Sequence, residues 1–194
     1  MLVKARTLLA TLVLAVLPMT APASTGRDIN AAQIPINDRP MLILLGRVEG
    51  PDGYNTISYS SDMSLTKPLT QMTLQEVLDF QDRMVRNGAA SSAIGKYQFI
   101  RDTLAELIEI HDLDPTIHFD RRMQDYLARI KMQDCGFYDP KLSDIEVGNC
   151  LARTWAALPV LTGSKRGRSY YHGTAGNKSR VSLDTMLAVL ENRF

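Results

Sequence analysis

Glu49 is the residue in this sequence whose surroundings best suit acid–base chemistry. It follows an apolar segment, residues 41–48, in which hydrophobic side chains recur at helical spacing, and Gly50 and Pro51 come next. Because proline cannot continue a helix, the pattern predicts a helix whose last turn contains Glu49. Apolar neighbours and the negative end of the helix dipole both disfavour the carboxylate and so raise its pKa. Glu49 is therefore a candidate general acid at the bottom of a cleft, and the alternative is a solvated glutamate at a helix end.

Other reactive residue types lack the spacing that their chemistry requires. The three histidines, His111, His118 and His172, show no metal-ligand spacing and have no Cys or Glu partner at the interval of a zinc site. No glycine-rich phosphate loop is present, and neither Cys135 nor Cys150 has the local sequence of a known nucleophile. We therefore expect no metal and no other cofactor.

Residues 1–23 have the pattern of a secretory signal peptide. Lys4 and Arg6 form a short positive region, residues 7–17 are apolar, and residues 21–23 form an A-x-A cleavage signal. The apolar run is too short to span a bilayer comfortably, so we expect a periplasmic or secreted protein that has no other membrane segment. A retained membrane anchor is the alternative.

The charge balance argues against a protein that binds nucleic acid through a general basic field. The chain carries 22 basic and 21 acidic residues, and the signal segment holds two of the basic ones, so the mature chain has a formal charge of −1. Export would place Cys135 and Cys150 in an oxidising compartment. A disulfide between them would stabilise the fold by roughly 3 kcal/mol in the chain-entropy model, and two free buried thiols are the alternative.

The length of 194 residues suits one domain after the signal segment. Residues 24–40 predict a loose N-terminal segment and residues 41–194 the folded domain. Helix starts are predicted at the capping boxes of residues 73–76 and 143–146 and at the N-caps Asp120 and Ser182. The helix that begins after Ser143 is expected to carry Trp155 into the core and to stop before Pro159. With one short strand over residues 54–59, the predicted fold class is mainly α with a small β element.

Several short segments resemble, in the same order, the phage lambda endolysin family of peptidoglycan lytic transglycosylases. Val48-Glu49-Gly50 followed by Gly53-Tyr54 resembles that family's catalytic glutamate and its Gly-Tyr strand. The other matching segments are Gly95-Lys96-Tyr97-Gln98, Gln124-Asp125 with Leu127-Ala128, and the WAALP of residues 155–159. Residues 170–173 with Gly176-Asn177 resemble an extension found in longer relatives. The resemblance implies a lysozyme-like fold and cleavage of peptidoglycan glycan strands between N-acetylmuramic acid and N-acetylglucosamine. We expect the protein to act as a monomer.

Two positions depart from the family pattern. Asn55 stands where the phage enzyme has Asp, so a nearby carboxylate is missing. Lys96 stands where the family has Arg, which keeps the charge but loses a planar fork of donors. Neither change touches Glu49.

The available carboxylates favour a mechanism with one acid. A hydrolytic glycosidase uses two carboxylates, about 5 Å apart if retaining and about 6.5–9.5 Å if inverting. The remaining candidates for a second one, Asp52 and Asp62, lie in turn and loop sequence. A lytic transglycosylase manages with Glu49 alone, because the C6 hydroxyl of the muramic sugar attacks the anomeric carbon and gives a 1,6-anhydro product. A hydrolytic lysozyme (muramidase) and a non-catalytic glycan-binding envelope protein are the alternatives.

The residues predicted to bind the substrate are Tyr54, Asn55, Tyr97, Gln98, Tyr171 and Asn177. Tyr97 is expected to pack on a sugar ring and Gln98 to hydrogen-bond a hydroxyl or acetamide, and a core-packed pair at a helix start is the alternative. Asn55 is expected to bind an acetamide, unless it is an ordinary strand residue. The cations in the glycine-rich loop of residues 162–180, Lys165, Arg166 and Arg168, are expected to be solvated. The alternative is a cleft wall whose cations meet the carboxylates of the peptide stem.

Overall fold

A computed structural model describes residues 36–174 and 176–194, and it is mostly helical as predicted. The α-helices are α1 Arg39–Val48, α2 Leu74–Arg86, α3 Arg101–Ile110, α4 Arg121–Asp134, α5 Asp144–Thr154 and α6 Leu183–Glu191. Short 3₁₀ helices are η2 Ile36–Asp38, η3 Gly53–Asn55, η4 Leu69–Gln71 and η5 Gly163–Lys165. Within these described ranges, no helix has the length and apolar character that crossing a membrane requires.

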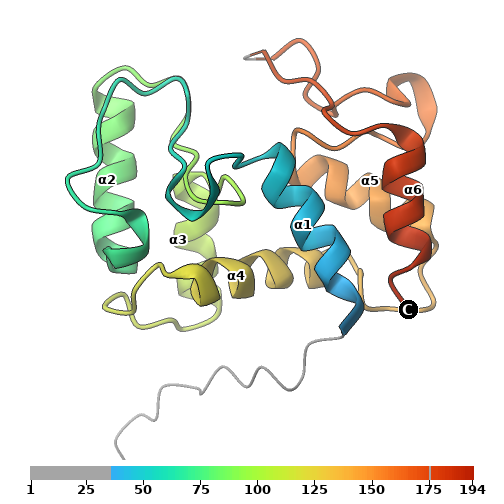
Figure 1. The fold of residues 1–194 in the computed structure, drawn as a ribbon, viewed down its shortest axis with the longest axis horizontal. Helices are drawn as coiled ribbons and strands as arrows, with labels where there is room; N and C mark the ends of the chain where they lie inside the picture. Colours follow the sequence, from blue (N-terminus) through green and yellow to red (C-terminus); the bar gives the residue numbers. More distant parts are fainter. Residues whose placement is uncertain (1–35, 175) are drawn as a thin grey trace, which may run out of the picture.

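The helices form two groups on either side of α1 (Figure 1). Helices α2 and α3 stand on one side, α5 and α6 on the other, and α4 runs along the bottom between the two groups. One continuous set of buried side chains joins them, and α1 contributes Met41, Leu42 and Leu45 to it. Helix α1 therefore ends, at Glu49, in the middle of the molecule.

The starts of α2, α4, α5 and α6 were predicted correctly, because each depends on residues three positions apart. Both capping boxes are formed: Thr73 and Ser143 each accept a hydrogen bond from the backbone N–H of a glutamate, whose side chain accepts one in return. Asp120 and Ser182 cap α4 and α6 in the same way, with their side chains accepting from an N–H three residues later.

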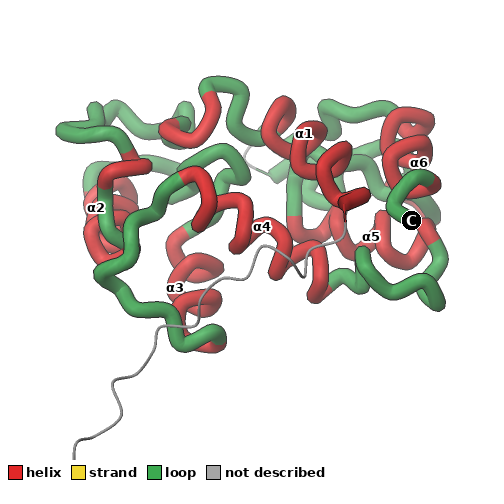
Figure 2. The backbone as a smooth tube through the Cα atoms, turned by 60° about the horizontal axis from the view of Figure 1, so that its bottom comes forward, coloured by secondary structure: helices red, strands yellow, loops and turns green. Residues whose placement is uncertain are grey.

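The predicted strand over residues 54–59 is wrong. The chain forms η3 there, and afterwards only isolated antiparallel bridges pair Ile57 with Ile94 and Ile94 with Phe99. Figure 2 shows the described chain as helices joined by loops. A run of β-branched and aromatic residues becomes a strand only where a neighbouring segment offers a ladder of partners, and here the neighbour pairs at single positions.

The N-terminal boundaries also differ in part from the prediction. The signal peptide predicted over residues 1–23 lies outside the described residues. The loose segment predicted to reach residue 40 is wrong for its last five residues, since η2 begins at Ile36 and α1 at Arg39. Asp38 explains this order: it is buried, and its Oδ2 accepts from Arg129 Nε at 2.6 Å and from the Tyr138 hydroxyl at 3.2 Å.

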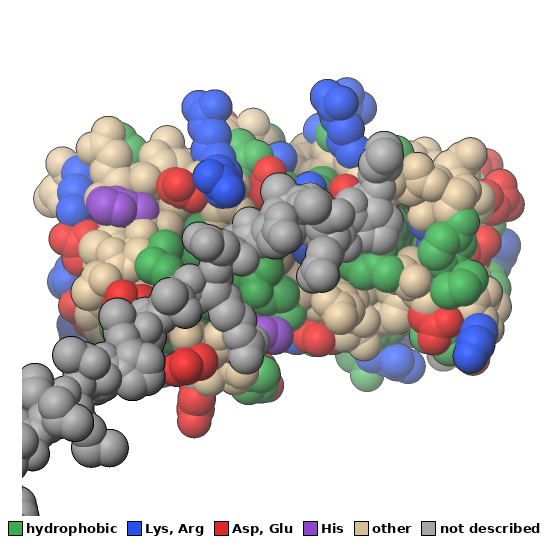
Figure 3. Space-filling model, turned by 90° about the horizontal axis from the view of Figure 1, so that it is seen from below, with side chains coloured by type: hydrophobic (Ala, Val, Ile, Leu, Met, Phe, Trp, Pro, Cys, Tyr) green, Lys and Arg blue, Asp and Glu red, His purple; other side chains and the backbone are tan. Residues whose placement is uncertain are grey.

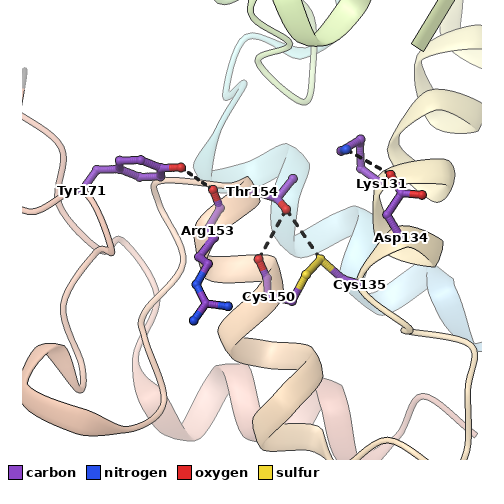
Figure 4. Close-up of a disulfide and its surroundings, with 7 residues drawn as sticks. All are labelled: Lys131, Asp134, Cys135, Cys150, Arg153, Thr154 and Tyr171. Atoms are coloured by element: carbon purple, nitrogen blue, oxygen red, sulfur yellow. Dashed lines mark hydrogen bonds and ion pairs between the residues drawn. A yellow bond between two sulfur atoms is a disulfide. The ribbon is translucent and has the colours of Figure 1, made fainter. Parts of the chain in front are cut away.

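Helix α5 ends earlier than predicted, because Trp155 leaves the helix. It adopts an extended conformation (φ −120°, ψ 115°) as the C-cap, and its indole N–H donates to the Tyr97 carbonyl at 3.1 Å. Trp155 is buried, as predicted. Cys135, the C-cap of α4, forms a disulfide with Cys150 on α5, with 2.07 Å between the sulfur atoms (Figure 4).

Acidic and basic side chains are both spread over the face seen from below (Figure 3). On the part of this face that the picture leaves visible, neither sign of charge gathers into a continuous patch. This distribution agrees with the near-zero net charge of the chain, +1 in formal terms.

Candidate functional site

Glu49 is the C-cap of α1, the position at which the sequence placed it. Its backbone N–H still donates to the Leu45 carbonyl at 2.9 Å, so the residue continues the last helical turn. Its side chain is half-buried. The helix end therefore presents one carboxyl group that the protein shields in part from water.

Two residues that are distant from Glu49 in the sequence, Ala157 and Arg180, lie beside this end of α1. The Ala157 N–H donates to Glu49 Oε1 at 2.9 Å. Arg180 donates from Nη1 to the Val48 carbonyl at 3.1 Å, and its own N–H donates to the Ala157 carbonyl at 2.8 Å. The segment after α5 and the segment before α6 are thus fastened to each other and to the end of α1.

Burial raises the pKa of Glu49 above its ordinary value. The hydrogen bond from Ala157 and the positive charge of Arg180 both lower that pKa, but burial is the largest of the three influences. A raised pKa keeps more of the acid protonated near neutral pH, which is what proton donation to a leaving group requires.

A second polar cluster is centred on Lys96. Its Nζ donates to the Tyr54 hydroxyl at 3.0 Å and lies 3.7 Å from Asp125 Oδ1. The same ammonium group lies over the rings of Tyr54 and Tyr97, at 4.6 and 5.0 Å from their centroids. The two tyrosine hydroxyls donate to Asp125 Oδ1 at 2.9 and 2.6 Å. Burial, followed by the hydrogen bond to Asp125, raises the pKa of Tyr97, so this phenol keeps its proton.

The Lys96 cluster lies directly against the end of α1. A Cβ atom added to Gly46 would come within 2.4 Å of Lys96 Cε, and one added to Gly50 would come within 2.6 Å of the Lys96 carbonyl oxygen. The Gly50 contact is with backbone, so only glycine leaves room there, whereas the Gly46 contact is with the flexible Lys96 side chain. The backbone just after Glu49 is therefore held against the backbone of residues 95–96.

Gln124 joins the loops that meet at this point. Its Nε2 donates to the carbonyls of Tyr54 and Phe119, both at 3.0 Å, and its Oε1 accepts from the Lys96 N–H at 2.9 Å. Gly95 has φ 74°, and a Cβ there would lie 2.5 Å from Gln124 Oε1. The Gly95 and Gln124 segments singled out in the sequence are thus in direct contact.

The predicted contact between Tyr97 and a sugar ring is wrong for this structure, since Tyr97 is fully buried. Tyr54 is half-buried, and its phenol is directed to Asp125. Gln98 is half-buried with φ 50°, and its Nε2 donates to the Gly95 carbonyl at 2.9 Å. Asn55 is exposed, and its Oδ1 accepts from the N–H and hydroxyl of Thr70 at 3.1 and 3.3 Å.

The last two predicted binding residues lie in the loop between α5 and α6. Tyr171 is exposed, and its hydroxyl donates to the Arg153 carbonyl at 2.5 Å (Figure 4). Asn177 is half-buried, and its backbone N–H donates to the Thr174 carbonyl at 2.9 Å. No contact in the described structure joins either side chain to Glu49.

Ala157 and Arg180 are the residues beside Glu49 that the sequence did not reveal. A backbone N–H carries no sequence signal, and Arg180 is one of several cations in a loop. Two surface pockets of the described structure lie elsewhere, one between α2 and α3 and one beside α5, and Glu49 lines neither. A cleft over Glu49 stays a prediction.

The described residues contain no group of three or more His, Cys, Asp and Glu side chains arranged to hold a metal ion. Comparisons of the chain with models of protein families, with curated proteins and with solved structures returned no match in any of the three. The relation to the endolysin family stays a prediction from the segments quoted above.

Proposed function

We propose that this protein is a peptidoglycan lytic transglycosylase with a lysozyme-like fold, in which Glu49 is the catalytic residue. One observation carries the proposal: Glu49 is a half-buried acid at a helix end, its pKa is raised by burial, and the groups that oppose this rise are Ala157 and Arg180. No carboxylate of the described residues is among the groups that shift its pKa. Asp52 and Asp62 are both exposed.

Glu49 supplies the proton for the first step. Oε1 accepts from the Ala157 N–H, so the proton of the neutral acid resides on the other oxygen, Oε2. Oε2 donates this proton to the glycosidic oxygen while the bond from that oxygen to the anomeric carbon of the muramic sugar breaks. The Ala157 N–H and the Arg180 charge stabilise the carboxylate that forms.

The same carboxylate completes the reaction. The C6 hydroxyl oxygen of the muramic sugar bonds to the anomeric carbon. The proton of that hydroxyl passes to the Glu49 carboxylate, which is thereby protonated again. The nucleophile belongs to the substrate, so no second protein carboxylate is required and the ring closure gains from proximity. The products are a 1,6-anhydromuramic end and a free hydroxyl on the other sugar, and no water is consumed.

Digestion of purified peptidoglycan followed by mass spectrometry tests this proposal. Soluble fragments that end in 1,6-anhydromuramic acid are expected. Fragments with only ordinary reducing ends would instead identify a hydrolytic lysozyme, and binding to walls without release of fragments would identify a glycan-binding protein.

The matched variants are Glu49→Gln and Glu106→Gln. Glu106 is an exposed glutamate on α3, so its amide controls for loss of one negative charge. Glu49→Gln is expected to lower turnover by roughly 10²–10⁴, because the general acid is lost. Near wild-type turnover in a folded Glu49→Gln protein would remove Glu49 from its role. Export, which the signal segment of residues 1–23 predicts, is tested separately by locating the protein in fractionated cells.

A further inference from the structure

A surface pocket beside the C-terminal half of α5 has no role in the mechanism above. It has a volume of about 230 Å³ and lies between α5 and the loop that follows it. The residues that shape its chemistry are Asn149, Arg153, Thr162, Ser164, Lys165 and Tyr170. Its lining therefore combines two cations, hydroxyl groups and one aromatic ring.

The two cations converge on Tyr170. Arg153 Cζ lies 5.6 Å and Lys165 Nζ 4.7 Å from the centroid of the ring, and Lys165 Nζ donates to the Tyr170 carbonyl at 2.7 Å. Within the described residues, neither Arg153 nor Lys165 forms an ion pair with an acidic side chain. Two positive charges thus share one small pocket whose described lining contains no acidic side chain.

The polar groups of the pocket are fixed before any ligand arrives. Asn149 Nδ2 donates to the Thr162 hydroxyl at 2.9 Å, while Asn149 Oδ1 accepts from the Leu161 N–H at 2.8 Å. Thr162 Oγ1 accepts this bond, so its own proton remains available for another acceptor. The pocket therefore offers a hydroxyl donor next to the cations.

The loop that carries Lys165 and Tyr170 is held in shape by its own backbone. Pro159 bridges Ser169, and Val160 bridges Arg166. The Val160 N–H donates to the Arg168 carbonyl at 2.8 Å, and its carbonyl accepts from the Gly167 N–H at 2.8 Å. The backbone that carries Lys165 therefore does not have to be ordered when the pocket binds an anion.

We propose that this pocket binds a carboxylate group of the acidic peptide stem that is attached to the glycan. Arginine and lysine beside a hydroxyl donor provide charge-assisted hydrogen bonds to a carboxylate. The proposal rests on the proposed function, and position supports it. Arg153 is four residues from Ala157 in the chain, so the Cα atoms of Arg153 and Ala157 are at most about 14 Å apart. Ala157 in turn contacts Glu49. A stem next to the cleaved bond would lie within reach.

The test compares two substrates: glycan strands that carry their stems, and the same strands after an amidase has removed the stems. The unaltered protein is expected to have the lower KM for the stem-bearing strands. In the double variant Arg153→Gln with Lys165→Gln, this preference should fall roughly threefold to tenfold, as expected for two partly exposed charge pairs. The matched control, Arg86→Gln with Lys141→Gln, removes two exposed cations elsewhere and should keep the preference.

A titration calorimetry experiment with the unaltered protein separates the sources of the anion. The free stem peptide is expected to bind, and the double variant to bind it at least threefold more weakly. Inorganic phosphate that binds as tightly as the peptide would overturn the assignment to the stem. Equal KM values of the unaltered protein for the two substrates would also overturn it. So would a ratio of the two KM values that is unchanged in the double variant. If neither substrate is cleaved, the proposed function fails, and the peptide titration still decides whether the pocket binds stems.

Discussion

Replacing Glu49 by glutamine should raise the stability of the protein while removing its activity, and the gain should depend on pH in one direction. Burial raises the pKa of Glu49 above the ordinary 4.5, so the folded protein holds on to a proton that the unfolded chain releases. The glutamine side chain does not titrate, and its Oε1 can still accept from the Ala157 N–H. The variant therefore isolates the effect of ionising this group.

The sign and size follow from linkage. Below pH 4.5 the carboxyl is protonated in both states, and the wild-type protein keeps its full stability. Between 4.5 and the raised folded pKa, the free energy of unfolding falls as pH increases, by up to about 1.4 kcal/mol per pH unit. The advantage of Glu49→Gln over wild type should grow at the same rate and then level off. In a domain of this size, that rate corresponds to roughly 3–6 °C of melting temperature per pH unit.

Urea unfolding of the two proteins at several pH values from 3.5 to 9 measures this difference. Any difference in the free energy of unfolding that the new amide group adds equally at every pH does not affect the test, because the prediction concerns only how the difference changes with pH. Glu106→Gln, on an exposed surface, should differ from wild type by less than about 0.5 kcal/mol throughout. An advantage of Glu49→Gln that stays flat, or that shrinks as pH rises, would refute the idea that burial dominates the environment of Glu49.

Three further predictions concern the elements that position the site. Arg193 is buried and donates to one carboxylate and several backbone carbonyls, so Arg193→Ala should lower the free energy of unfolding by about 3–5 kcal/mol in urea titrations, and a loss below about 1 kcal/mol would contradict this. Gly50→Ala places a methyl group within 3 Å of the backbone of residues 95–96, so both stability and turnover should fall, and an unchanged melting temperature would show that the loop yields freely. Replacing Cys135 and Cys150 by serine opens a link 15 residues long and should destabilise the protein by roughly 3 kcal/mol, whereas equal melting temperatures with and without reductant in the wild type would show that no such link forms.

Local signals carried the prediction of the helices. The N-caps of α2, α4, α5 and α6 are side chains that bond to a backbone N–H three residues later, so the whole interaction lies within one helical turn. The end of α1 at Glu49 follows in the same way, since Pro51 and Gly50 act on their own neighbours. These features were readable because the groups that make them are adjacent in the sequence.

The predictions that failed each depended on a partner distant in the chain. A strand at residues 54–59 needed a ladder along residues 93–99, which pairs at single positions only. The ring of Tyr97 was expected to meet a ligand, but the residue is fully buried: its hydroxyl donates to Asp125, and its backbone carbonyl accepts from the Trp155 indole. Residue type and local pattern do not say which face of a segment turns inward.

The sequence by itself determined that this protein is mostly helical and that one acid, Glu49, closes its first long helix. Only the tertiary structure decided what surrounds that acid: Ala157 lies 108 residues away in the chain, and Arg180 binds a carbonyl 132 residues away. Helix ends depend on hydrogen bonds made within a few residues. The pKa of a carboxyl group depends on how far folding removes it from water and on the charges and hydrogen-bonding groups that folding places beside it.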